Sequence, residues 1–152
     1  MPLTLTLSDE PASMVFAQRL AGALTHGLVI YLIGDLGAGK TTLVRGALQG
    51  LGYTGRVKSP TYTLLEPYEI NGFSLRHFDL YRMSDPQEWE EAGFRDEANA
   101  HNILLIEWPD KAGDLLPAAD LILQFDILTS GRTLNITAHS PKGEQCLSHL
   151  QN

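Results

Sequence analysis

The chain has 152 residues with a net charge of −7, of which 43% are hydrophobic and 19% are charged. These values are typical of a single soluble domain, and no stretch reaches the ~18 consecutive apolar residues that a membrane-spanning helix needs. The acidic balance disfavours a protein that holds nucleic acid through its own basic surface. The single cysteine, Cys146, cannot form a disulfide framework, and the start of the chain lacks the pattern of a secretory signal. We therefore expect one domain over residues 1–152, with frayed C-terminal residues, located in the cytoplasm.

The first third of the chain predicts a strand, a helix and a second strand. Leu3–Leu7 is strand-like, and Ser8 is a plausible N-cap for a helix with acidic residues and a proline in its first turn. Apolar residues then recur at helical spacing until Gly27, which we expect to end the helix after His26. Residues 27–33 form a nearly continuous apolar run, which is typical of a parallel strand covered on both faces.

The remainder of the chain predicts a helix over 41–51 and then a β-rich half. Strands over 62–70 and 73–80 flank Asn71-Gly72, the strongest short hairpin signal. A capping box at 84–87 predicts a helix through about residue 98, followed by a buried strand over 103–106 that ends in Glu107. Alternating apolar residues over 121–127 and 134–138 predict a last hairpin. The fold class is thus α/β: a single-domain, P-loop NTPase-like fold whose mixed parallel and antiparallel sheet is flanked by helices.

Residues 34–41 (GDLGAGKT) match the phosphate-binding pattern G-x-x-x-x-G-K-[ST]. Glycines let the backbone wrap an anion and point successive N–H groups at it, and the following helix adds the positive end of its dipole. Lys40 supplies a mobile charge for the β- and γ-phosphates, the Thr41 hydroxyl can ligate Mg²⁺, and Thr42 can bond the α-phosphate side. The sequence therefore predicts a site for a nucleoside triphosphate with magnesium.

A phosphate loop needs an acidic partner for Mg²⁺, usually at the end of a neighbouring buried strand. Glu107 ends the apolar run ILLI, and Asp79 ends the strand within HFDLYR. Each carboxylate could instead lie on a solvated loop or pair with an arginine. Both remain candidates for the metal, and the sequence does not decide which one dominates.

The segment 59–63 (SPTYT) lies where a γ-phosphate-sensing loop is found in GTPase-like proteins, with Thr61 or Thr63 as the sensor, although an ordinary turn explains it equally well. The chain has no Asn-Lys-x-Asp signature for guanine, which favours ATP. No water-positioning glutamine follows Asp79, so we expect slow hydrolysis that depends on a partner.

Five segments occur together in an order and spacing that we associate with one family: GDLGAGKTT (34–42), KSPTYTL (58–64), HFDLYR (77–82), SDP (84–86) and IEWP (106–109). On these motifs the chain resembles the bacterial TsaE family, formerly YjeE, the ATPase of tRNA threonylcarbamoyladenosine biosynthesis. The resemblance covers nearly the whole chain, and five linked motifs are far more specific than the glycine-rich loop alone.

The resemblance implies roles for individual residues. Thr41 and Glu107 would hold Mg²⁺, Asp79 would act at the metal or in hydrolysis, and Lys40 would join both carboxylates in catalysis. Trp108 would lie beside the site, although a core tryptophan is an equally good interpretation, and residues 8–10 would approach the adenine. Arg132 would contact the nucleotide, or else be a solvated hairpin arginine. The nucleotide-binding residues implied are Gly37, Ala38, Gly39, Lys40, Thr41, Thr42 and Arg132.

The resemblance also implies partners: the TsaB–TsaD pair, with TsaC supplying the activated threonylcarbamoyl group, tRNA contacted only indirectly, and no membrane. Two alternatives stay open, namely a small-molecule kinase that uses the same loop and a non-hydrolysing, nucleotide-gated interaction module. The acidic residues Asp85, Glu88, Glu90 and Glu91, exposed beside Trp89, form either a solvated helix face or a partner surface. The five histidines are scattered without zinc-site spacing, and we expect no catalytic pair from Cys146 and His149.

Overall fold

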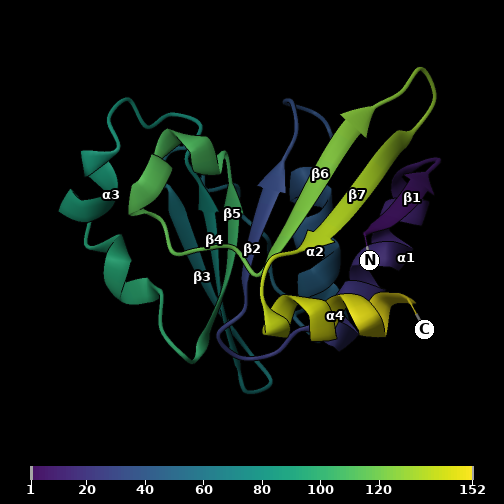
Figure 1. Cartoon of the computed structure of the whole chain (residues 1–152), viewed down its shortest axis with the longest axis horizontal. Coiled ribbons are helices and arrows are strands. Elements are labelled where there is room, and N and C mark those ends of the chain that lie inside the picture. The colour runs from purple at the N-terminus through teal and green to yellow at the C-terminus, as the bar shows by residue number, and fades with distance from the viewer. Residues whose placement is uncertain (1, 152) are drawn as a thin grey trace.

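A seven-stranded sheet in the order β1-β7-β6-β2-β5-β4-β3 organises the computed structural model, which describes residues 2–151 (Figure 1). Strands β4, β5, β2 and β6 run parallel to one another, whereas β3, β7 and β1 pair antiparallel to their neighbours. The predicted mixed α/β sheet is therefore confirmed. The strands are β1 (Leu3–Leu7), β2 (Val29–Ile33), β3 (Leu65–Ile70), β4 (Phe73–Asp79), β5 (Asn102–Glu107), β6 (Leu121–Ile127) and β7 (Arg132–Ala138).

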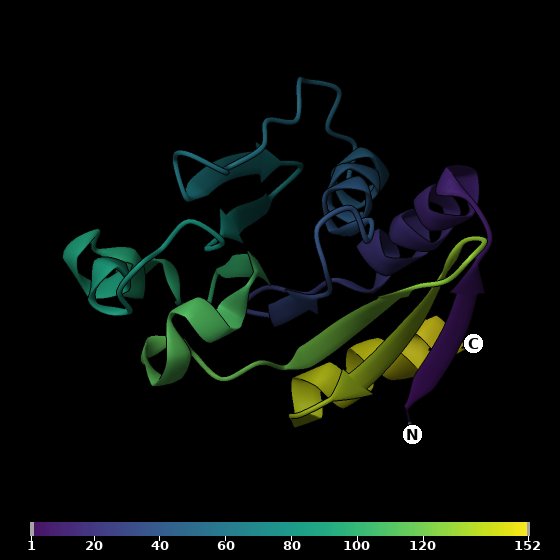
Figure 2. The same cartoon turned by 90° about the horizontal axis from the view of Figure 1, so that it is seen from above.

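Helices cover the two faces of the sheet unequally. The α-helices are α1 (Glu10–Ala23), α2 (Lys40–Gly50), α3 (Gln87–Glu91) and α4 (Pro141–Gln151), and the short 3₁₀ turns are η1 (Phe94–Glu97), η2 (Pro109–Lys111) and η3 (Gly113–Leu115). Residues of α1, α2 and α4 share the larger core with one face of the sheet, while α3 and the 3₁₀ turns cover the other face over β4 and β5. Figure 2 shows α1 and α2 side by side, with the turns of residues 109–115 across the sheet from them. No helix in residues 2–151 has the length and apolar character to cross a membrane.

Strand β5 is buried on both faces because successive side chains alternate between the two cores. Ile103 and Leu105 belong to the larger core, and Leu104 and Ile106 belong to the smaller one around Trp89. All six residues of β5 are buried. The continuous apolar run ILLI is therefore explained by burial of β5 on both faces, as the sequence predicts for a parallel strand.

Small residues bring α1 and α2 into close contact. A Cβ atom added to Gly46 would lie 2.5 Å from the Cβ of Ala17, and one added to Gly50 would lie 2.6 Å from the Cβ of Ala21. Larger side chains at these positions would push the helices apart. The packing against α1 therefore helps to place the first turn of α2, which follows the glycine-rich loop.

Helix α1 begins one residue later and ends earlier than the sequence predicts. The N-cap is Asp9, whose carboxylate accepts a hydrogen bond from the N–H of Ala12 at 2.9 Å, so the prediction of Ser8 is wrong by one residue. An ionised carboxylate at this position also complements the helix dipole. The helix ends at Ala23, because Leu24 is extended, and Gly27 with φ of +80° belongs to the turn that leads into β2.

The single helix predicted from the capping box to residue 98 is wrong. The chain forms α3, then turns at Gly93 with φ of +75°, and continues as η1. The cap is shifted as well, since the carboxylate of Glu88, one residue beyond the predicted box, accepts from the N–H groups of Ser84 at 2.7 Å and Asp85 at 2.9 Å.

Trp89 lies in the core and not on a surface. Its side chain is fully buried, and its ring packs 4.9 Å from that of Phe78 and 5.4 Å from that of Phe94. Trp89 therefore adds no exposed ring to the neighbouring acidic surface. The acidic residues of this segment stay at the surface because Trp89 takes the one inward position of the short helix.

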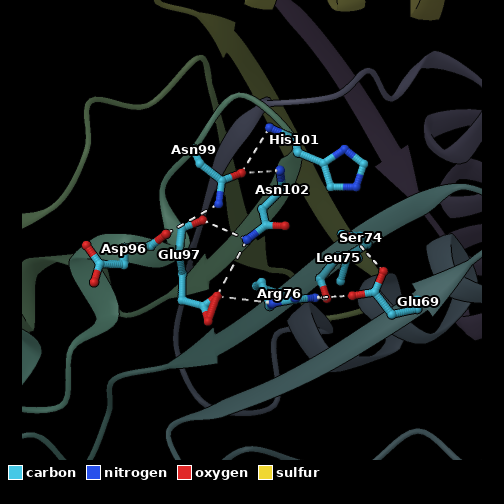
Figure 3. Close-up of polar contacts among 9 residues, drawn as sticks. All are labelled: Glu69, Ser74, Leu75, Arg76, Asp96, Glu97, Asn99, His101 and Asn102. Atoms are coloured by element: carbon cyan, nitrogen blue, oxygen red, sulfur yellow. Dashed lines mark hydrogen bonds and ion pairs between the residues drawn. The ribbon is translucent and has the colours of Figure 1, made fainter.

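A polar network fastens η1 to the sheet (Figure 3). The guanidinium of Arg76 on β4 donates to Glu69 at 3.1 Å and to Glu97 at 3.2 Å. The side-chain amide of Asn102 donates to the backbone oxygen of Glu97 at 3.0 Å, and Asn99 accepts from the N–H of Asn102 at 2.8 Å. Because Arg76 is only 16% exposed, this pairing holds the segment more firmly than surface ion pairs do.

The last described residues belong to helix α4 (Pro141–Gln151), and the predicted fraying of the final residue lies outside the described part of the chain. Helix α4 buries Gly143, Cys146, Leu147 and Leu150 on one face, and Arg19 of α1 donates to the backbone oxygen of Leu150. Burial raises the pKa of the Cys146 thiol to about 11, which leaves it unsuited to act as a nucleophile. The expectation that Cys146 forms no catalytic pair thus has a structural reason.

Asp120, a buried carboxylate, joins the start of α4 to the sheet. Its carboxylate accepts from the N–H of Val29 at 2.7 Å and from the hydroxyl of Ser140 at 2.6 Å. The same hydroxyl accepts from the N–H of Gly143 at 3.0 Å. The backbone of α4 consequently passes so close to β6 that a Cβ on Gly143 would lie 1.9 Å from the backbone oxygen of Asp120.

We predict that Gly143→Ala lowers the free energy of unfolding by about 1–3 kcal/mol, the usual cost of overpacking a tight contact. The matched control is Gly22→Ala within α1, where an added Cβ meets no atom within 4 Å. That variant should gain about 0.5–1 kcal/mol from helix propensity alone. Urea denaturation followed by circular dichroism measures both, and equal stabilisation of the two variants would contradict the close contact.

Candidate functional site

The candidate site lies at the edge of the sheet where the parallel strands end. Strands β2, β4 and β5 run in the same direction, so their carboxyl ends meet. The glycine-rich loop leaves β2, Asp79 ends β4 and Glu107 ends β5. Asp79 and Glu107 are also direct partners in the strand register, which places their backbones on adjacent strands.

The glycine-rich loop needs its glycines for backbone conformation. Gly37 has φ of +81° and Gly39 has φ of +105°, in the left-handed region that other residues adopt at a cost. Gly39 caps α2, whose first N–H groups have no partner within the helix. Ala38 is fully buried, and its N–H donates to the backbone oxygen of Asp35 at 3.1 Å, so the structure does not expose this predicted nucleotide-binding residue to the cavity.

A cavity of ≈390 Å³ brings the predicted residues together. With the exception of Ala38, every residue predicted to bind nucleotide or metal lines this cavity. These residues are Gly37, Gly39, Lys40, Thr41, Thr42, Asp79, Glu107 and Arg132. The remaining wall comes from Glu10, Leu36, Ser59, Thr61 and Trp108.

Lys40 lies against the loop and against Trp108. Its ammonium group donates to the backbone oxygen of Gly34 at 2.5 Å and sits 4.0 Å from the centroid of the Trp108 ring. Burial lowers the pKa of Lys40, an effect opposed by the carboxylates of Glu107 and Asp79. Trp108 is half-buried, lines the cavity and packs against the smaller core, so both interpretations from the sequence hold in part.

The two carboxylates differ in their surroundings. Glu107 is 3% exposed, so it is not the solvated loop residue that the sequence left open. Its Oε2 lies 2.6 Å from Nε2 of His77. Asp79 is only partly buried and accepts from the N–H of Tyr81 at 3.1 Å. Burial raises the pKa of Asp79; the Tyr81 N–H opposes this shift, and the Glu107 carboxylate adds to it.

His77 is the site residue that the sequence did not predict. Its side chain is fully buried, two residues before Asp79 on β4 and thus on the same face of the sheet. A histidine two residues before a candidate carboxylate in the strand FSLRHFD was the available signal.

The donor set fits magnesium held together with phosphates. In residues 2–151 no three His, Cys, Asp or Glu side chains gather in a way that could hold a metal ion. Thr41, Asp79 and Glu107 offer hydroxyl and carboxylate oxygens in one cavity. Mg²⁺ is commonly bound by one or two carboxylates plus substrate phosphates, which matches such an incomplete set.

Residues from distant segments complete the cavity wall. A Cβ on Gly39 would lie 2.3 Å from Nη1 of Arg132, so this guanidinium lies directly over the loop. Ser59 and Thr61 line the cavity, and their hydroxyls are 2.7 Å apart. Thr63 bonds Glu66 at 3.2 Å and is not part of the wall, which leaves Thr61 as the candidate sensor.

Glu10, from the segment predicted to lie near the adenine, also reaches the cavity. A second cavity of ≈440 Å³ adjoins the first across Trp108, which lines both. Asp35, Asp110 and Asp126 contribute to its wall, together with Phe125. The sequence did not predict this second cavity.

Comparisons with known proteins agree with this architecture. Residues 7–134 match the family model described as threonylcarbamoyl adenosine biosynthesis protein TsaE. The tRNA threonylcarbamoyladenosine biosynthesis protein TsaE of Haemophilus influenzae is 44% identical over 99% of this chain and 98% of its own length. The protein of the same description from Bacillus subtilis is 42% identical over 74% of this chain and 69% of its own length.

A solved structure shows the same fold. The crystal structure of YdiB from Bacillus subtilis superposes with a TM-score of 0.79 and 27% identity, covering 99% of this chain and 95% of that one. The family model matches most of the chain, and a relative matches it almost end to end. This chain therefore belongs to the TsaE family of tRNA threonylcarbamoyladenosine biosynthesis proteins.

Proposed function

We propose that this protein binds ATP with Mg²⁺ and hydrolyses it as the ATPase of the tRNA threonylcarbamoyladenosine machinery. One observation carries the proposal: Lys40, Thr41, Asp79 and Glu107, predicted separately from three motifs, line one cavity. Family membership supplies the tRNA modification context. The chemistry is inferred from the residues that surround the cavity.

The loop would hold the phosphates. Its left-handed glycines and the free N–H groups at the start of α2 form a nest for an anion. Lys40 would leave the Gly34 oxygen to meet the β- and γ-phosphates, and Arg132 is positioned to add a second cation. Ligand charge would thereby replace hydrogen bonds that the loop makes with itself.

Thr41 and Glu107 would hold Mg²⁺, and Asp79 would act at the metal or on the attacking water. The ion, when bound, neutralises charge on the phosphates and orients them. Within the cavity wall there is no glutamine to orient water, so turnover by the protein alone should be slow.

Partners would complete the reaction. We propose that the protein acts on the TsaB–TsaD pair and that its ATP cycle permits their repeated turnover. A net charge of −7 suits a subunit that leaves most tRNA contacts to its partners. A buried, unpaired cysteine fits a cytoplasmic location, which belongs to the same proposal.

A small-molecule kinase is the second candidate, and the adjoining cavity of ≈440 Å³ is the observation in its favour. ATP labelled at the γ-phosphate separates the two functions. Release of free phosphate supports the ATPase, and transfer of label to a metabolite supports the kinase. Nucleotide-dependent complex formation without turnover would indicate an interaction module.

We predict that Lys40→Ala weakens ATP binding roughly 10- to 100-fold, the usual value of a charge-assisted hydrogen bond. Isothermal titration calorimetry measures the affinity. The matched control is Lys111→Ala, which removes the same charge from a residue of η2 outside the cavity wall. If both variants bind ATP as the wild type does, Lys40 does not contact the phosphates.

We predict that Glu107→Gln loses Mg²⁺-dependent hydrolysis by roughly 100-fold, because the amide keeps the shape of the side chain but not its charge. ATP binding in EDTA should be unchanged. Asp79→Asn is measured in parallel, with Glu66→Gln as the control outside the cavity wall. Full hydrolysis in Glu107→Gln together with its loss in Asp79→Asn would move the metal role to Asp79.

We predict that the ATPase rate rises when the TsaB–TsaD pair is added, since the cavity wall contains no glutamine to orient the attacking water. Phosphate release is measured with and without the pair, and Lys40→Ala serves as the inactive control. A rate that the pair does not change would overturn the partner-dependent mechanism. A wild-type protein without affinity for any nucleoside triphosphate would overturn the whole proposal.

A further inference from the structure

The contact between His77 and Glu107 joins two buried side chains. The side chain of His77 is 0% exposed and that of Glu107 is 4% exposed, and Nε2 and Oε2 are 2.6 Å apart. The two residues lie thirty positions apart in the sequence, on the neighbouring strands β4 and β5. A buried histidine is costly unless its polar atoms form hydrogen bonds.

The surroundings of His77 decide which nitrogen donates. Its other ring nitrogen, Nδ1, is buried without a hydrogen-bond partner in the described part of the chain. A proton on Nδ1 alone would leave a buried donor unpaired, and Nε2 would then need a proton from Glu107. A proton on Nε2 instead gives the Glu107 carboxylate a donor and leaves Nδ1 as a bare acceptor, which is the less costly arrangement.

This arrangement leaves the two oxygens of Glu107 unequal. Oε2 accepts from His77, while Oε1 takes part in no hydrogen bond within residues 2–151. Glu107 also lines the nucleotide cavity, so its carboxylate is fixed from behind and is open in front. A carboxylate held through one oxygen cannot rotate freely about its last torsion.

We propose that His77 is a positioning residue, which holds Oε2 of Glu107 so that the second carboxylate oxygen serves the magnesium–nucleotide complex. The inference rests on the proposed function, in which Glu107 is a ligand of Mg²⁺, and it names His77 as the residue that orients this ligand. Hydrogen bonds to metal-ligating carboxylates commonly change metal affinity by 10- to 100-fold. His77 itself touches neither the nucleotide nor the metal, because it is absent from the cavity wall.

The test compares His77→Leu, which removes the donor, with His77→Gln, whose amide N–H can occupy the place of Nε2. The affinity for ADP is measured by calorimetry in EDTA and over a Mg²⁺ series. The fluorescence of Trp108, which lines the cavity, provides a second readout. We expect His77→Leu to need roughly 10- to 100-fold more Mg²⁺ for its half-maximal effect, and His77→Gln to recover most of the loss. Affinity in EDTA should be equal in all three proteins.

A stability control separates positioning from a general effect on folding. Leu75 is fully buried on the same face of β4 but belongs to the apolar core. Leu75→Ala should lower the melting temperature while keeping the wild-type Mg²⁺ dependence. If the Mg²⁺ requirement instead follows melting temperature across all variants, His77 has only a structural role and the inference is overturned.

A measurement on the wild-type protein keeps the inference testable even if His77→Leu does not fold. Nitrogen-15 NMR of the histidine rings reports which nitrogen carries the proton. A protonated Nε2 of His77 supports the proposal, and an unprotonated Nε2 overturns it because Glu107 would then be the donor. If the wild type binds no nucleotide in EDTA or in Mg²⁺, the proposed function fails; if it binds normally and His77→Leu matches it, only this inference fails.

Discussion

The parallel pairing of β4, β5 and β2 is the constraint on which the site depends. It brings to one edge three chain segments whose polar residues lie far apart in the sequence: the glycine-rich loop, Asp79 and Glu107. Because β5 is buried on both faces, its register against its neighbours cannot slip by one residue without moving its side chains into the wrong core. The hydrophobic pattern of ILLI therefore also fixes the position of the carboxylate that follows it.

The positive charge of Lys40 offsets only part of the negative charge of the carboxylates in the site. Lys40 is desolvated and lies among carboxylates, and its hydrogen bond goes to a backbone oxygen of its own loop. Asp79 and Glu107 lie on adjacent strands, and the negative charge of Glu107 makes the ionised form of Asp79 more costly, which raises the pKa of Asp79. A divalent cation near the two carboxylates would reduce the repulsion between them. Phosphates near Lys40 and the N-terminus of α2 would give the ammonium group and the free N–H groups negatively charged partners.

Local signals in the sequence predicted most of the fold and most of the cavity wall. The loop pattern and the Asn71-Gly72 hairpin depend on backbone conformation at named residues, and such rules act within a few positions. The split of the predicted helix 84–98 follows from Gly93, and α4 was missed because its buried face includes a glycine and a cysteine in place of a strong apolar stripe. The pairing of His77 with Glu107 spans thirty positions, and no local rule predicts a contact between strands.

Two residues that contact or adjoin the site carboxylates have strained backbones. Leu64 with φ of +67° and Trp108 with φ of +57° adopt the left-handed conformation without being glycine. Leu64 accepts from the N–H of Asp79 at 3.1 Å, and Trp108 directly follows Glu107 and holds Lys40 over its ring. Non-glycine residues keep such conformations, at about 1 kcal/mol or more each, only where their surroundings enforce them. The strands thus supply the stability, and the edge where they end carries the strained backbone and incompletely paired polar groups that a ligand would complete.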